Sequence, residues 1–138
     1  VEPWLPLGAD TARRNVAGAA SDPQSILTLH GRLIALRRER PSLSVGTKTL
    51  LPAPEHLIAY ERALRAERHC IVLNLSHDPR EAALDGCAGR MVLSTYLDRT
   101  AEAVHGSVRL RPDEGLVIEA QPATGSSPSH APDMMPSR

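Results

Sequence analysis

The segment DPQSILTLHGRLIALRRERPSL, residues 22–43, predicts one amphipathic helix with a sharp end. Asp22 can cap the first free N–H groups, and Pro23 suits the first helical position. Apolar side chains then recur every three or four residues, as on the buried stripe of a helix: Ile26, Leu29, Leu33 and Leu36, widened by Leu27 and Ile34. Pro41 disfavours helical backbone at the residue before it, so the pattern predicts a helix over residues 23–39.

Beyond Pro41 the hydrophobic period changes to that of β-strands. Turn-forming residues separate most of the short runs, as at Asp85-Gly86. The run Cys70-Ile71-Val72-Leu73 is apolar throughout, as expected of a central strand that is covered on both faces. The spacing predicts an antiparallel β-sandwich or small barrel of about seven strands: residues 45–51, 57–63, 69–75, 81–84, 90–96, 107–111 and 115–119.

Three stretches lie outside this pattern. Residues 1–20 contain prolines and glycines without a sustained period, which predicts an extended, loop-rich lead-in. The stretch 97–106 is ambiguous. Residues 121–138 hold four prolines and four serines but few large apolar side chains, so we expect a disordered tail.

Composition narrows the classes of function. Basic and acidic residues both number 16, so the formal net charge is zero, which disfavours binding to nucleic acid or to a membrane surface. Aromatic residues make up 2% of the chain, which is too few for a module that stacks sugars on exposed rings. Nucleotide-binding motifs such as GxGxxG or the P-loop are absent from the sequence, and we expect no cofactor.

Cys70 and Cys87 form neither a CxxC pair nor a disulfide framework, so both are predicted to be buried free thiols. No apolar run approaches the roughly 20 residues that a membrane helix needs. The first residues lack the charged and apolar regions of a signal peptide. The sequence therefore predicts a cytoplasmic location.

Several polar residues have a structural interpretation. His30 lies on the apolar stripe and is predicted to be a packed core histidine. Glu61 and Glu81 lie in strand patterns and are expected to face solvent, while Asn74-Leu75-Ser76 is expected to be a false glycosylation match. Arg37, Arg38 and Arg40 suit a solvated helix end, where cations complement the helix dipole. We predict no metal site, because the remaining histidines lack ligand spacing: His56, His69, His77, His105 and His130.

A series of motifs stands in a specific order along the first 120 residues. The N-terminal part reads Pro3-Trp4-Leu5-Pro6, then Asn15-Val16, the Asp-Pro-x-Ser helix start, the arginine-rich helix end and the Pro-x-Leu exit. Residues 72–76 and 110–119 supply two further strand motifs. Together they resemble the last barrel helix and C-terminal β-sandwich of α-glucosidases and oligo-1,6-glucosidases of the α-amylase family, glycoside hydrolase family 13.

The resemblance implies a division into three parts. Residues 1–41 would be the end of an incomplete (β/α)8 catalytic barrel, residues 42–120 the C-terminal β-sandwich, and residues 121–138 the tail. In this family the catalytic carboxylates precede the Pro-Trp-Leu-Pro loop, so we predict no catalytic residue in this chain. Trp4 would lie near the rim of the active-site face as a substrate-binding candidate; alternatively, it fixes the loop by packing.

The sequence therefore predicts a C-terminal fragment of an enzyme that hydrolyses α-1,4 or α-1,6 glucosidic bonds in malto- or isomalto-oligosaccharides. Its role would be to stabilise the catalytic barrel, and the chain alone is expected to be inactive. The expected partner is the missing barrel, and oligosaccharide would bind only through that barrel. The alternative is a non-catalytic carbohydrate-binding or protein-interaction β-sandwich module.

Overall fold

A computed structural model describes residues 4, 6 and 8–121 of the chain. Three helices precede the strands: α1 (Val16–Ser21), α2 (Ile26–Glu39) and α3 (Pro41–Val45). Eight strands follow, namely β1 (Thr47–Leu51), β2 (Leu57–Leu64), β3 (Glu67–Asn74), β4 (Arg80–Ala83), β5 (Gly89–Ser94), β6 (Ala103–Val104), β7 (Ser107–Leu110) and β8 (Gly115–Ala120). The short β6 is the additional strand, and it lies in the stretch that the sequence left ambiguous.

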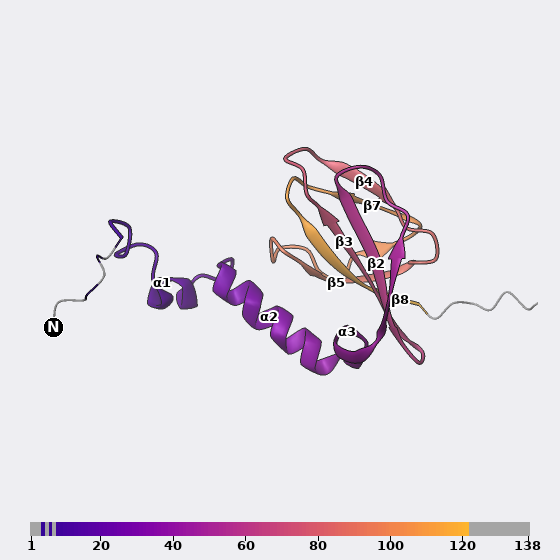
Figure 1. Cartoon of the computed structure of the whole chain (residues 1–138), viewed down its shortest axis with the longest axis horizontal. Coiled ribbons are helices and arrows are strands. Elements are labelled where there is room, and N and C mark those ends of the chain that lie inside the picture. The colour runs from indigo at the N-terminus through magenta and orange to yellow at the C-terminus, as the bar shows by residue number, and fades with distance from the viewer. Residues whose placement is uncertain (1–3, 5, 7, 122–138) are drawn as a thin grey trace, which may run out of the picture.

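The strands form two antiparallel layers (Figure 1). One sheet has six strands in the order β1-β2-β3-β8-β5-β6, and β4 pairs with β7 in a separate ribbon. Strand β3 lies between β2 and β8, with Ile71 opposite Tyr60 on one side and Val117 on the other. The predicted fold class, a mainly antiparallel β-sandwich preceded by an amphipathic helix, is confirmed.

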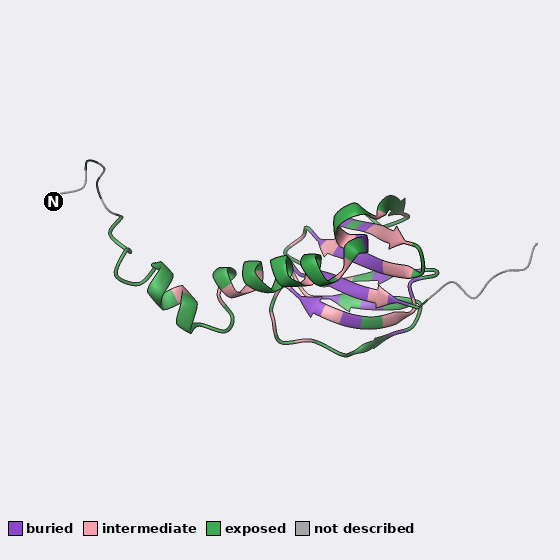
Figure 2. Cartoon of the chain, turned by 90° about the horizontal axis from the view of Figure 1, so that it is seen from below, coloured by how far each residue is buried: buried purple, intermediate pink, exposed green. Residues whose placement is uncertain are grey.

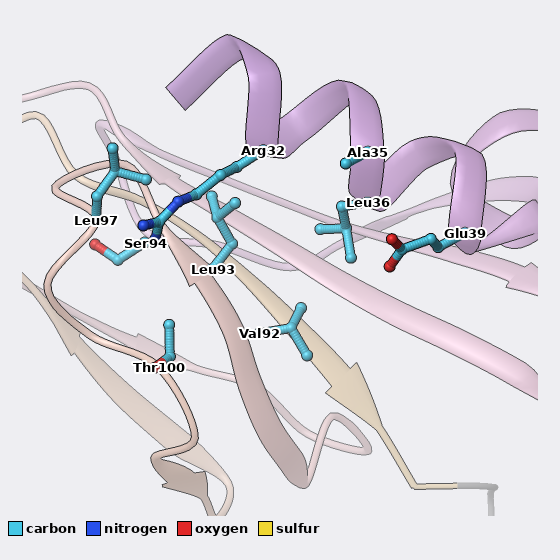
Figure 3. A pocket seen from close by; sticks show the side chains of 9 residues that line it. All are labelled: Arg32, Ala35, Leu36, Glu39, Val92, Leu93, Ser94, Leu97 and Thr100. Carbon is cyan, nitrogen blue, oxygen red and sulfur yellow. The ribbon is translucent and has the colours of Figure 1, made fainter. Parts of the chain in front are cut away.

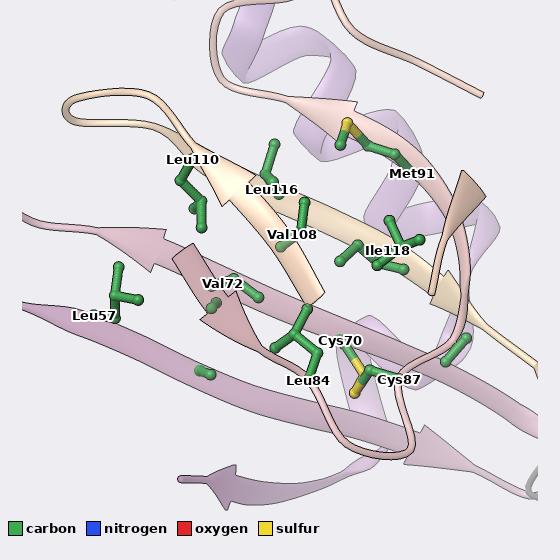
Figure 4. Close-up of a cluster of buried hydrophobic side chains, with 14 residues drawn as sticks. Leu57, Cys70, Val72, Leu84, Cys87, Met91, Val108, Leu110, Leu116 and Ile118 are labelled. Atoms are coloured by element: carbon green, nitrogen blue, oxygen red, sulfur yellow. A yellow bond between two sulfur atoms is a disulfide. The ribbon is translucent and has the colours of Figure 1, made fainter. Parts of the chain in front are cut away.

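Alternation along β3 explains why this strand is central. Cys70 and Val72 point into the core between the two layers, and both are fully buried. Ile71 belongs instead to a second apolar cluster on the helix-covered face of the sheet. Successive side chains of the strand point to opposite faces of the sheet. Because both faces are covered, both alternating sets are apolar, which produces the continuous apolar run. Figure 4 shows the inner core, in which Leu116 and Ile118 of β8 accompany these side chains.

Cys70 and Cys87 form a disulfide within the inner core, so the prediction of two free thiols was wrong (Figure 4). Cys70 comes from β3, whereas Cys87 lies in the loop between β4 and β5. Their Cα atoms are 6.2 Å apart, within the range that a disulfide can bridge. Sequence spacing could not reveal this pairing, because the strand order that brings the two residues together is a tertiary property.

Helix α2 starts later than predicted. Ser25, rather than Asp22, is the N-cap: its Oγ accepts a hydrogen bond from the N–H of Thr28 at 3.1 Å. Asp22 accepts from the N–H of Gln24 in the turn before the helix. The predicted end is correct, because α2 stops at Glu39. The lead-in is not wholly extended, since α1 begins where Asn15 caps the N–H of Gly18.

Helix α2 projects from the sandwich, and its C-terminal part lies nearest to the sheet (Figures 1 and 2). Leu29 and Leu36 pack against the cluster formed by Ile71, Leu93 and Val117. Most of the remaining helix surface is exposed, as Figure 2 shows. The prediction that His30 packs in a core was wrong, because His30 is exposed and its Nδ1 bonds only to the carbonyl of Ile26, at 2.9 Å.

Apart from Gln121, the tail expected at residues 121–138 lies outside the described residues, as do positions 1–3, 5 and 7. The proposed division into a barrel end and a sandwich stays a prediction. Among the helices described, none combines the length and the apolar character that crossing a bilayer would require.

The disulfide generates the first prediction. It closes a loop across 17 residues of sequence separation, and a loop of this size constrains the unfolded chain by about 3 kcal/mol. We expect reduction to lower the free energy of unfolding by about this amount in urea denaturation followed by circular dichroism. The matched control is the double variant Cys70→Ala/Cys87→Ala, whose unfolding should not respond to reductant. An equal response in both proteins would contradict a disulfide origin.

Candidate functional site

Two grooves lie between α2 and the helix-covered face of the sheet, and both are lined by Leu36 and Leu93. The larger has a volume of about 550 Å³, and Tyr60, Ile71 and Leu73 form part of its floor. The smaller, of about 210 Å³, lies between α2 and β5 (Figure 3). In Figure 3, Leu36 points from the helix toward the sheet, and it lines both grooves. The helix is therefore supported by few side chains rather than by a broad packed surface.

Two of the three aromatic side chains carry a cation over the ring. The Nζ of Lys48 lies 4.9 Å from the centroid of the Tyr60 ring, beside the larger groove. The guanidinium of Arg111 lies 4.1 Å from the Tyr96 ring, and the Tyr96 hydroxyl donates to the carbonyl of Pro112. Each tyrosine therefore has one face covered by a cation. Trp4 is 91% exposed, and its substrate-binding role stays a prediction.

The outward side of α2 carries apolar side chains without cover from the described part of the chain. Ile26 is 69% exposed and Ile34 is 51% exposed. Leu27 and Leu33 are also exposed, although Leu33 borders the larger groove. We call Ile26, Leu27 and Ile34 the exposed edge of α2. A helix that is apolar on both sides is typical of one buried between two bodies.

Ser42, in α3, is fully buried where the helices meet the sheet. Its N–H donates to Oε1 of Glu67 at 2.8 Å, and its carbonyl accepts from Nε of Arg62 at 3.1 Å. Its hydroxyl is hydrogen-bonded to Nδ1 of His69, also at 2.8 Å. All three polar groups of this residue are therefore bound by side chains of β2 and β3.

Further contacts fix the same junction. Arg40 forms an ion pair with Glu119 of β8 at 2.9 Å, so this arginine is not simply solvated as predicted. Arg37 and Arg38 are exposed, as expected. A Cβ at Gly46 would collide with the backbone of α3 and β2, so glycine permits the close approach of these two elements.

A buried carboxylate, Glu114, organises the loop between β7 and β8. It accepts hydrogen bonds from the Ser94 hydroxyl at 2.7 Å and from the backbone N–H of Arg111 at 2.8 Å. The guanidinium groups of Arg111 and Arg99 approach it at 2.6 Å and 3.2 Å. Arg111 also pairs with Asp98, so the cluster joins β5, the loop after it and the β7–β8 loop.

This cluster is unsuited to acid catalysis. Burial would raise the pKa of Glu114, but hydrogen bonds from Arg111 and Ser94 outweigh burial and lower the pKa below its usual value. A glycosidase general acid needs the opposite shift, because it must hold a proton near neutral pH. The carboxylate therefore has a structural role, with its acceptor sites occupied by protein donors.

Glu61 differs from its prediction. It lies beside Cys70 and Cys87, but the two sulfurs are bonded to each other and Arg68 binds the carboxylate. Its side chain is 17% exposed, so it is not the solvent-facing group that was expected. Glu81 is exposed as predicted. This grouping therefore offers a metal ion no free thiolate.

Asn74 has a structural role. Its side-chain amide donates to the carbonyls of Asp78 and Arg111, and its oxygen accepts from the N–H of Ser76. It is 2% exposed, which agrees with the expectation that the glycosylation match is false.

Sequence reasoning missed the groups around Ser42. One available signal was His69, a polar residue next to the apolar run of the central strand. Glu67 and Ser42 gave no such signal, because a charged residue at a strand start and a serine after a proline are ordinary. Their relation depends on α3 folding back onto β3.

The chain is similar in sequence to carbohydrate-active enzymes. It is 32% identical over 105 residues to a glucan 1,6-alpha-glucosidase of Streptococcus dysgalactiae subsp. equisimilis, covering 75% of this chain and 20% of the relative. It is 29% identical to a trehalose-6-phosphate hydrolase of Escherichia coli K12, covering 83% and 21%. It is 28% identical to an oligo-1,6-glucosidase of Parageobacillus thermoglucosidasius, covering 85% and 22%. The chain thus spans about a fifth of the length of these relatives. No family model matches the chain.

Solved structures give the same result for the fold. The trehalulose synthase MutB of Pseudomonas mesoacidophila MX-45 matches with a TM-score of 0.79 and 25% identity, covering 87% of this chain and 22% of the synthase. A MutB variant with sucrose bound gives the same TM-score and identity. The predicted resemblance to the α-amylase family is therefore confirmed in sequence and in fold.

The Glu114 cluster generates the second prediction. Glu114→Gln keeps the shape of the side chain but removes the buried anion that Arg99 and Arg111 share, and breaking a buried pair in this way costs about 3 kcal/mol. We expect a loss of this size in urea unfolding at neutral pH. Glu81→Gln, an exposed change on β4, is the matched control and should be nearly neutral.

The same comparison has a pH dependence. Because folding lowers the pKa of Glu114, its stabilisation is present above the usual value of 4.5 and is lost as pH falls below it. The difference between the native chain and Glu114→Gln should therefore shrink in acid. A difference that is constant down to acidic pH would contradict this assignment.

Proposed function

We propose that this chain, which is related to the α-glucosidases of the α-amylase family, is the C-terminal part of such an enzyme. In that position it would stabilise the catalytic barrel of the enzyme. The parent enzyme would hydrolyse α-1,4 or α-1,6 glucosidic bonds in malto- or isomalto-oligosaccharides. The names of two relatives, a glucan 1,6-alpha-glucosidase and an oligo-1,6-glucosidase, support the α-1,6 part of this substrate class. Within the chain itself the role would be structural rather than catalytic.

One observation carries the structural role: α2 has two apolar sides. Its inner side contacts the sheet through Leu29 and Leu36, whereas its exposed edge, which includes Ile34, has no cover from the described residues. Burying one large aliphatic side chain is worth about 2 kcal/mol. Covering the exposed edge against a catalytic body would therefore provide several kcal/mol of coupling between that body and the sandwich.

The chemistry of the described residues agrees with a structural role for this chain and a catalytic role for the parent enzyme's barrel. Glu114, the buried carboxylate, is neutralised by arginines and is held ionised. The two tyrosines carry cations on their rings. Hydrolysis and sugar recognition would both be supplied by the parent enzyme's barrel.

The cytoplasmic location forms part of the proposal, but one observation opposes it. A buried disulfide is typical of proteins that fold in an oxidising compartment. Counting free thiols in protein trapped with an alkylating agent directly from cells would decide between the two. Two free thiols would support the cytoplasm, and none would support an oxidising compartment.

The third prediction concerns activity. The purified 138-residue chain should not hydrolyse maltose, isomaltose or an aryl α-glucoside above the level of a blank purification. It should also show no saturable binding of malto-oligosaccharides in calorimetric titration. Hydrolysis that copurifies with the chain would overturn the structural role, and clear binding would favour the carbohydrate-binding alternative.

The fourth prediction concerns the partner. We expect the chain to bind a relative's oligo-1,6-glucosidase truncated before the region that matches this chain. Ile34→Asp, on the exposed edge, should weaken the complex by roughly tenfold or more, because it places a charge in an apolar interface. The control Ala83→Asp adds the same charge on an exposed strand position of β4 and should bind normally. Equal weakening by both variants, or no complex with the native chain, would contradict the proposal.

A further inference from the structure

The contacts of Ser42 suggest more than packing. Ser42 lies three residues after α2 ends, at the point where the helical segment is joined to the sheet. It is fully buried, and each of its polar groups has a side-chain partner from the sheet. Elsewhere α2 rests on the sheet through a few leucines beside two grooves. This junction therefore provides three directional polar contacts between the helices and the sandwich.

We propose that Ser42, Arg62, Glu67 and His69 form a latch that holds α2 and α3 on the sheet, and that the latch opens when His69 takes up a proton. We call these four residues the Ser42 latch. The latch requires no activity of the chain. Only an effect of the latch on a parent enzyme would rest on the proposed function.

His69 is the member of the latch whose charge can change near neutral pH. Its side chain is fully buried, with Nδ1 bound to Ser42 and with Nε2 lacking a hydrogen-bond partner among the described residues. A neutral ring carries one proton, which can lie on Nδ1 in the hydrogen bond to Ser42 and leave Nε2 unprotonated. A protonated ring would place a positive charge in this site and leave a buried Nε2–H unpaired.

The charged groups around His69 partly oppose one another. Glu67 lies 3.9 Å from Nδ1, and Glu119 of β8 also favours the protonated ring. Arg40 at the end of α2 opposes protonation, and Arg62 adds a further positive charge from β2. Burial is the largest influence, and the balance lowers the pKa of His69 below its usual value of 6.5.

The direction of the pH effect follows from this shift. A docked latch keeps His69 neutral, whereas release exposes the ring to water and restores its usual pKa. The latch therefore contributes its full stability above about pH 6.5, and that stability is lost as the pH falls below this value. Acid would loosen α2 and α3 before it affects strands without such a group.

Hydrogen–deuterium exchange of the full chain, followed by mass spectrometry, tests the proposal. Exchange is compared at about pH 7.5 and about pH 5.5, with times scaled for the intrinsic rate. We expect protection of residues 36–46 to fall at the lower pH, by at most about tenfold, because pH 5.5 lies one unit below the usual pKa of 6.5. Protection of β8 should stay unchanged. Equal protection of residues 36–46 at both pH values would overturn the latch.

Two variants assign the effect. His69→Asn retains a short polar group that can bond to Ser42 but cannot titrate, so its exchange at residues 36–46 should not depend on pH. His77→Asn removes an exposed histidine and should retain the native response. A response that persists in His69→Asn would overturn the assignment to this residue.

A third measurement uses the native chain, so it does not depend on whether a variant folds. The imidazole of His69 can be titrated in the native chain by nuclear magnetic resonance. We expect a midpoint below 6.5, and a midpoint at or above 6.5 would overturn the proposal. Because these experiments use the chain alone, their failure is distinct from a failure to bind a catalytic barrel.

Discussion

Strand β3 must be covered on both of its faces, and the arrangement of the whole chain follows from this requirement. Cys70 and Val72 are covered by the second layer of strands, whereas Ile71 on the opposite face needs another element. Helices α2 and α3 supply that cover, which is why the helical segment is joined to the sandwich rather than separate from it. The coverage is thin, because α2 lies beside two open grooves. The position of α2 therefore depends on polar contacts at its end as much as on apolar packing.

Local patterns predicted most of the elements, because each depends on residues close in sequence. The change of hydrophobic period at Pro41 separated the helix from the strands, and the apolar run of β3 identified the central strand. The Cys70–Cys87 disulfide could not be predicted, since it depends on which strands face each other. The same reason applies to Ser42 and His69, which lie 27 residues apart. The missed α1 and the late start of α2 have another cause: competing caps, such as Asn15 and Ser25, are nearly equivalent in sequence.

For the candidate site, the sequence predicted only which functions to disfavour, namely sugar stacking and catalysis. The scarcity of aromatic residues disfavoured sugar stacking; in the structure a cation lies over the ring of Tyr60 and of Tyr96, and the absence of sugar binding stays a prediction. The absence of matching motifs for the family's catalytic carboxylates left Glu114 without an assigned role. Without Arg99 and Arg111 the buried charge of Glu114 would destabilise the fold, because an unpaired buried charge is costly. The two guanidinium groups favour the ionised form of Glu114. The carboxylate therefore fixes the loop and cannot act as a general acid.

The proposed role of α2 between two bodies would account for its composition, because such a helix has to pack against both of them. If the helix belonged to the sandwich alone, Ile26 and Ile34 would be expected to be polar, because both are more than half exposed in the described part of the chain. If it belonged to another body alone, Leu36 would have no reason to meet Ile71 and Leu93. Apolar packing on both sides leaves the helix free to slide, since such contacts are not directional. Directional hydrogen bonds at Ser42 remove that freedom, so the junction sets the geometry that the apolar surfaces then stabilise.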